Sequence, residues 1–154
     1  MARDDIPDDL RPRWISSLSL AEPAVLEAHW AGLDPKPTFR WLRPAESGLV
    51  MLRGRAGGNG QAFNLGEMTA TRAVAILEGN PTLTGYGYVA GRSKRHAELA
   101  ALFDALLQDP SRREALWRDL VLPVEATRTA ARRKRAVAVG ATRVDFTTMV
   151  RGDV

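Results

Sequence analysis

Residues 82–108 read T-L-T-G-Y-G-Y-V-A-G-R-S-K-R-H-A-E-L-A-A-L-F-D-A-L-L-Q, and this stretch decides the fold class. Its first part, 82–89, carries Thr and Tyr side chains that are common in β-strands. The second part, 93–108, has an apolar stripe at helical spacing, formed by Leu99, Leu102, Phe103 and Leu106. The stretch therefore predicts a strand that leads directly into an amphipathic helix.

Both ends of the predicted helix carry boundary signals. Ser93 suits the N-cap position, because its hydroxyl can accept a hydrogen bond from a free backbone N–H of the first turn. Asp109-Pro110 ends the helix, since the residue before a proline disfavours helical dihedral angles. The helix is therefore expected to lie between these two signals.

Upstream of this stretch the sequence predicts further strands. Residues typical of strands cluster or alternate with polar residues over 38–43, 48–55 and 61–65. The glycine-rich link Gly57-Gly58-Asn59-Gly60 predicts a hairpin turn between the last two segments. Residues 68–77 suit another strand, because their threonines alternate with apolar neighbours, but their alanines suit a helix equally well.

The rest of the chain predicts helices and one last strand. Residues 13–33 show a helical pattern that is interrupted at Pro23, which suggests two helices that meet there. A shorter helix is expected over 111–120, and a longer one rich in Ala and Arg over 123–139. Alternating apolar residues predict a strand over 143–150.

Together these elements predict an α+β fold, in which a mainly antiparallel sheet is flanked by helices. The length of 154 residues favours a single domain. Because residues 1–13 are polar and acidic, we expect them to form a disordered or frayed tail, and residues 14–154 to form the domain.

The composition excludes several classes of site. The chain has no cysteine, which removes disulfides, iron–sulfur ligation by thiolates and a cysteine nucleophile. Its two histidines, His29 and His96, lack the spacing of a helical metal motif. We therefore expect no metal site and no cofactor. No apolar run approaches the ~20 residues that span a bilayer, and the N-terminus does not resemble a signal peptide, so a cytoplasmic location is expected.

The start of the predicted helix is a candidate anion site. Arg92, Lys94 and Arg95 lie beside the free backbone N–H groups and the positive end of the helix dipole, which together can hold a phosphate or carboxylate. The alternative is a helix start whose charges face water. His96 in the same turn is interpreted as a packing or hydrogen-bonding residue, because the sequence shows no carboxylate to orient it.

Two further sequence patterns bear on nucleotide or nucleic-acid binding. The glycines of 85–91 have the wrong spacing for a dinucleotide fingerprint and are interpreted as turn glycines. Basic residues gather near the C-terminal end at Arg128, Arg132, Arg133, Lys134 and Arg135. Such a cluster suits a solvated face, an acidic protein partner or, as the alternative function, a free-standing nucleic-acid-binding domain.

Four segments carry a family resemblance in the same order along the chain. They are Ala45-Glu46-Ser47-Gly48-Leu49-Val50, the run from Gly57 to Ala73, Gly91-Arg92-Ser93-Lys94-Arg95-His96-Ala97-Glu98, and the run from Arg143 to Asp153. In these segments the sequence resembles the PhnG family, whose members are subunits of the bacterial carbon–phosphorus lyase machinery. The resemblance covers about residues 14–153.

The resemblance implies a role inside a complex. PhnG proteins assemble with PhnI, PhnH and PhnJ, and transiently with PhnL. With PhnI, PhnH and PhnL they support transfer of an alkylphosphonate onto the ribose of ATP, which displaces adenine and forms α-D-ribose 1-alkylphosphonate 5-triphosphate. Because the nucleosidase chemistry is attributed to PhnI and the radical cleavage to PhnJ, the resemblance implies no catalytic residue on this chain.

The C-terminal segment is expected to be buried either in the chain's own sheet or against the partner. Phe146, Met149 and Arg151 are its proposed anchors, because these residue types are enriched in the cores of protein interfaces. The resemblance therefore implies a non-catalytic scaffold that stabilises PhnI.

Overall fold

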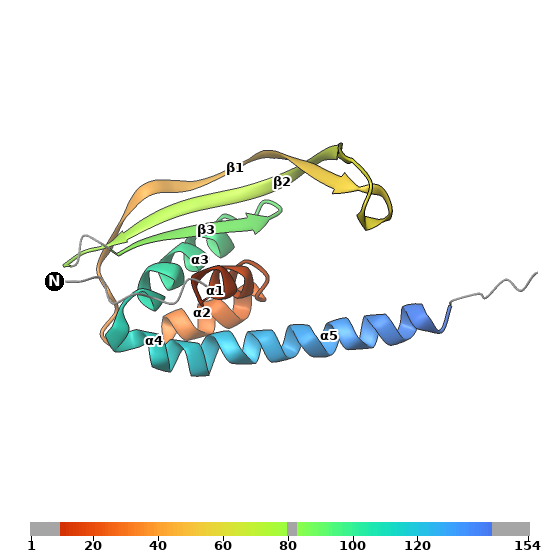
Figure 1. Ribbon diagram of the computed structural model, residues 1–154. Helices are drawn as coiled ribbons and strands as arrows, with labels where there is room; N and C mark the ends of the chain where they lie inside the picture. Colours follow the sequence, from red (N-terminus) through yellow and green to blue (C-terminus); the bar gives the residue numbers. More distant parts are fainter. Residues whose placement is uncertain (1–9, 80–82, 143–154) are drawn as a thin grey trace, which may run out of the picture.

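The computed structural model describes residues 10–79 and 83–142 (Figure 1). The helical elements are α1 (Leu10–Ser19), α2 (Pro23–Ala31), α3 (Lys94–Leu107), α4 (Pro110–Leu116), the π-helical turn η2 (Trp117–Val121) and α5 (Leu122–Gly140). The strands are β1 (Phe39–Arg55), β2 (Ala62–Leu77) and β3 (Thr84–Ala90), and a short 3₁₀ turn, η1 (Ala56–Gly58), follows β1.

The strands form one antiparallel sheet in the order β1-β2-β3. Helix α3 packs against one face of this sheet, and α1 and α2 lie beyond α3 on the same side (Figure 1). The predicted α+β fold, a mainly antiparallel sheet with helices, is therefore confirmed. No helix in the described residues is both long enough and apolar enough to cross a membrane.

The strands are longer than the sequence predicts. Segments 38–43 and 48–55 merge into β1, which continues through Pro44 with shifts of register on both sides of Arg43. Residues 61–65 and 68–77 likewise merge into β2. The helical alternative for 68–77 is wrong, because alternate residues of this segment are buried against α3, which is the period of a strand.

The structure describes part of the predicted N-terminal tail and none of the predicted C-terminal strand. Helix α1 begins at Leu10, so the last four residues of the expected frayed tail, 10–13, are helical. They are held there because Arg11 pairs with Asp104 and Arg13 with Glu125. The predicted strand at 143–150 lies outside the described residues.

Two glycines of β3 allow α3 to approach the sheet closely. A Cβ built on Gly85 would overlap the carbonyl oxygen of Ala101, and one built on Gly87 would overlap that of Ala97. The interpretation of these residues as turn glycines is therefore wrong, because both lie within a strand and have no positive φ. Only Gly91, with φ +89°, serves the turn into α3.

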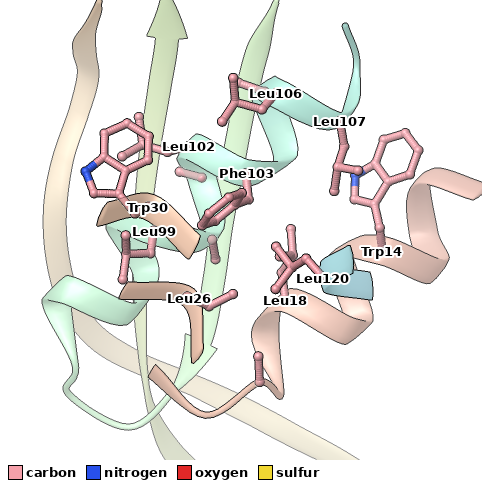
Figure 2. Close-up of a cluster of buried hydrophobic side chains, with 14 of the residues drawn as sticks. Trp14, Leu18, Leu26, Trp30, Leu99, Leu102, Phe103, Leu106, Leu107 and Leu120 are labelled. Carbon is pink, nitrogen blue, oxygen red and sulfur yellow. The ribbon is translucent and has the colours of Figure 1, made fainter. Parts of the chain in front are cut away.

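The apolar stripe of α3 forms the centre of the core (Figure 2). Leu99, Leu102, Phe103 and Leu106 are all fully buried, as the helical spacing predicts. Trp30 of α2 packs edge-on against Phe103, with ring centroids 6.3 Å apart. The core therefore lies between α3 and the two N-terminal helices.

Two elements extend beyond this core at the same end of the domain, one from the sheet and one from the helices (Figure 1). One is the distal part of the β1-β2 hairpin, which continues past the end of β3, since the last pair between β2 and β3 is Ala70 with Ala90. The other is the distal half of α5, in which every residue from 131 to 140 is exposed.

Candidate functional site

The predicted anion site lies at the N-terminus of α3, on the surface. Ser93 caps the helix as predicted, since its hydroxyl oxygen accepts from the backbone N–H of His96 at 3.3 Å. Arg95 donates two hydrogen bonds to Glu27 of α2, at 2.8 and 2.9 Å, and these bonds hold the pKa of Glu27 below its ordinary value of 4.5. Because Arg95 is held by this carboxylate, Arg92 and Lys94 supply the exposed positive charge of the turn.

His96 is a buried hydrogen-bonding residue, as the sequence predicts. Its side chain is 8% exposed, and its Nε2 lies 2.9 Å from the carbonyl oxygen of Leu18. The ring therefore ties α3 to the end of α1.

The other histidine joins α2 to the helical segment around Pro123. Proline has no N–H to donate to the carbonyl oxygen four residues earlier, which belongs to Asp119. His29 Nε2 lies 3.0 Å from this oxygen and supplies the missing partner. Both histidines thus have structural roles in the described chain.

A fully buried carboxylate, which the sequence analysis missed, organises the interior. Asp104 accepts from Arg11 Nη2 at 2.9 Å, from Trp14 Nε1 at 2.7 Å and from the backbone N–H of Tyr86 at 2.9 Å. It joins α1, α3 and β3, three elements that are distant in sequence. Its signal was present, because Asp104 is the one ionisable residue in the otherwise apolar run 99–107.

The face of the sheet opposite α3 carries an exposed ion network. Glu46 accepts from Arg43 at 2.6 Å and from Arg72 at 2.7 Å, and these hydrogen bonds lower the pKa of Glu46. Arg72 also donates to the Tyr88 hydroxyl at 3.4 Å. Because these residues come from three strands, only the register of the sheet brings them together.

A hollow of 240 Å³ borders this network. Its lining includes Glu46, Arg72 and Tyr88 together with backbone and apolar side chains of β1. Because its charged groups pair with one another, the hollow suits a contact with another molecule's surface better than the binding of a substrate.

The basic cluster of α5 is exposed in the structure. Arg128 Nη1 reaches the carbonyl oxygen of Ser16 at 3.5 Å, which holds the first residue of the cluster near the domain. The remaining basic residues lie farther along the helix, and no carboxylate of the described chain pairs with them: Arg132, Arg133, Lys134 and Arg135.

The structure bears on two further expectations, the interface anchors and the metal site. Phe146, Met149 and Arg151, the proposed interface anchors, lie outside the described residues. In residues 10–79 and 83–142 no group of three or more His, Asp or Glu side chains lies where it could hold a metal ion.

The chain matches the family described as "Phosphonate metabolism protein PhnG" over residues 9–152. The chain belongs to the PhnG family. It is also 41% identical over 150 residues to the protein of Rhizobium meliloti (strain 1021) named alpha-D-ribose 1-methylphosphonate 5-triphosphate synthase subunit PhnG. That alignment covers 97% of this chain and 94% of the relative, so the two proteins are similar over nearly their whole lengths.

Three of the four segments that carry the PhnG resemblance lie at distinct places in the fold, and the fourth, 143–153, lies outside the described residues. The segment 45–50 lies on β1 where the strand leaves the core, and the glycine-rich segment forms the hairpin tip and β2. The segment 91–98 forms the turn into α3. The comparisons support the subunit function and not the alternative, a free-standing nucleic-acid-binding domain.

Proposed function

We propose that this chain is a non-catalytic subunit of an α-D-ribose 1-methylphosphonate 5-triphosphate synthase. In this function the complex transfers an alkylphosphonate onto the ribose of ATP and releases adenine. The observation that carries the proposal is the 41% identity, over nearly the whole of both chains, to a relative that bears this name. Because ATP is a metabolite of the cytoplasm, the complex is proposed to act there.

The proposed partners are PhnI, PhnH and PhnJ, with PhnL as a transient partner. PhnI is the subunit that this chain is proposed to stabilise, and PhnI carries the nucleosidase-type step. The structure is compatible with a scaffold, since the ionisable side chains that it buries, His96 and Asp104, are both engaged in hydrogen bonds inside the domain. The C-terminal residues Phe146, Met149 and Arg151 remain proposed contacts of this scaffold.

An anion site at the start of α3 is a secondary proposal. Arg92 and Lys94 would contact phosphates of ATP or of the product, next to the free N–H groups of the first helical turn. Arg95 is proposed to contribute less to anion binding than the sequence suggests, because its guanidinium already donates to the Glu27 carboxylate.

The anion proposal is tested by nucleotide binding to the assembled complex. The double variant Arg92→Ala with Lys94→Ala is expected to weaken ATP binding several-fold, while the control Arg40→Ala, which removes an exposed cation of β1, leaves it unchanged. Equal ATP affinity in both variants would remove the anion site and leave the scaffold function standing.

The main proposal is tested by measuring adenine release. The cognate subunits are co-expressed with and without this chain, and the purified products are incubated with ATP and methylphosphonate. We expect adenine release only, or far faster, when this chain is present. Equal rates with and without the chain would refute its function as a synthase subunit.

A further inference from the structure

The distal part of the hairpin exposes several large apolar side chains. We define the arm as residues 48–69, which comprise the ends of β1 and β2 and the turn between them. Six of its large apolar side chains have exposed fractions between 37% and 65%, and they are Leu49, Val50, Met51, Leu52, Phe63 and Leu65. A concentration of exposed large apolar side chains of this kind is typical of a site of protein–protein contact.

The arm is apolar on both of its faces. Leu49 pairs with Thr69, two residues from the buried Thr71, so Leu49 and Met51 continue the face that packs on α3 nearer the core. Val50 and Leu52 alternate with them and therefore point to the opposite face. An antiparallel ribbon normally has one apolar and one polar face, so both faces of this one offer apolar contact surface to a partner.

The edges of the arm are also open. Strand β3 ends opposite Ala70 and Gly91 donates to the Thr69 carbonyl oxygen, so the backbone of β2 from 62 to 68 has no neighbouring strand on that side among the described residues. β1 is an outer strand of the sheet, and no strand of residues 10–79 and 83–142 pairs with its other edge. Unpaired strand edges that carry apolar side chains are surfaces to which another chain can add.

The charges of this end of the molecule indicate the kind of partner. The arm exposes Arg53 and Arg55, with Glu67 as its one acidic residue. The distal half of α5, 131–140, has four basic residues and no acidic one, and it projects from the same side of the domain as the arm (Figure 1). Two copies that met through these surfaces would bring like charges together, so a second copy of this chain is disfavoured.

The distal half of α5 has apolar contact surface of its own. Val137 is 74% exposed and Val139 is 64% exposed, next to the basic residues. The combination of basic and apolar side chains fits a protein surface on which acidic residues surround apolar ones.

We propose that the arm and the distal half of α5 together form the docking surface for a different protein that presents acidic residues around an apolar patch. This inference rests on the proposed function, in which the partner is another subunit of the synthase. It assigns the contact to two exposed elements of this chain, of which the sequence had linked only the basic cluster of α5 to an acidic protein partner.

The test is co-purification of the cognate synthase subunits with the tagged full-length chain. The arm variant carries Leu49→Thr, Met51→Thr and Phe63→Thr, because threonine keeps the preference for a strand while it removes apolar surface. Its control carries Leu20→Thr and Leu42→Thr, which remove apolar side chains of similar exposure, 54% and 58%, outside the arm.

A second pair of variants tests the charges. Arg132→Glu with Arg135→Glu reverses two charges of α5, and Lys36→Glu with Arg40→Glu reverses two exposed charges elsewhere. We expect the arm variant and the α5 variant each to bind the partner subunit at least tenfold more weakly than the wild type. Both controls should bind within about twofold of the wild type.

The outcomes separate this inference from the proposed function. If the wild-type chain retains no synthase subunit, the proposed function and the docking surface both fail. If it retains them and the arm and α5 variants do so equally well, the docking surface fails alone. Loss of retention after nuclease treatment, or a dimer of the isolated chain that the arm variant converts to a monomer, would also overturn the inference, because nucleic acid or a second copy would then cover this surface.

Discussion

Substituting Gly87 by alanine tests the close contact between α3 and β3. A Cβ at this position would overlap the carbonyl oxygen of Ala97 and would lie 2.8 Å from the backbone nitrogen of Ala101. Both neighbours are backbone atoms of α3, so no side-chain rotation can make room. The helix as a whole must therefore move away from the sheet.

The expected loss of stability follows from what this movement disturbs. α3 carries Leu99, Leu102, Phe103 and Leu106, all fully buried, so a displacement of the helix loosens the centre of the core. Overpacking a well-packed interior costs about 1–3 kcal/mol, and a clash with backbone belongs at the upper end of that range. For a chain of this length, a loss of about 3 kcal/mol lowers Tm by roughly 6–12 °C.

The matched control is Gly48→Ala in β1. Gly48 also lies in a strand and has no positive φ, but a Cβ at this position meets nothing within 4 Å. Alanine there restricts the unfolded chain and is expected to leave stability unchanged or to raise it by up to about 1 kcal/mol.

Urea unfolding of both variants, followed by tryptophan fluorescence, measures the two effects. Trp14 and Trp30 are buried in the core and report on its loss. If Gly87→Ala and Gly48→Ala had free energies of unfolding within about 0.5 kcal/mol of each other, the close-contact explanation for the β3 glycines would be refuted.

Three further predictions concern polar contacts. Asp104→Ala leaves buried donors without an acceptor and is expected to lower the free energy of unfolding in urea by about 3 kcal/mol. The control Glu125→Ala, at the more exposed pair with Arg13, should lower it by less than about 1 kcal/mol. Equal losses in the two variants would contradict the burial assigned to Asp104. Because Arg95 lowers the pKa of Glu27, their pair stabilises the fold above about pH 4.5 and is lost as pH falls through the lowered pKa. Arg95→Gln should therefore raise the pKa of Glu27 toward 4.5 in an NMR titration, and an unchanged value would refute the pairing. Thr71→Val removes the hydroxyl that donates to the Gly91 carbonyl at 2.7 Å and should lower stability by about 1–2 kcal/mol, measured by thermal unfolding; no loss would show that this bond is not needed.

The sequence predicts those parts of the fold that depend on local patterns. The stripe of α3, the Ser93 cap, the glycine-rich turn of the hairpin and the break at Pro23 each lie where their spacing or residue type indicated. These features depend on residues close in sequence, so periodicity and turn chemistry are sufficient to find them.

The features that the sequence did not predict depend on distant contacts. The roles of Gly85 and Gly87 follow from how closely α3 approaches β3, and Asp104 gains its partners from elements up to 93 residues away. The sequence pattern also cannot show whether a strand is covered, because the continuous apolar run 49–52 of the exposed arm is the pattern of a strand buried on both faces. For this reason the arm was assigned as a hairpin without its surface being recognised.

The most direct test of the central claim is native mass spectrometry of this chain co-expressed with PhnI and the other proposed subunits. We expect a stable assembly that contains both this chain and PhnI, with no free chain at 16.9 kDa when the partners are in excess. Detection of this chain only as a free 16.9 kDa species, while the other subunits assemble without it, would contradict its function as a subunit of the synthase.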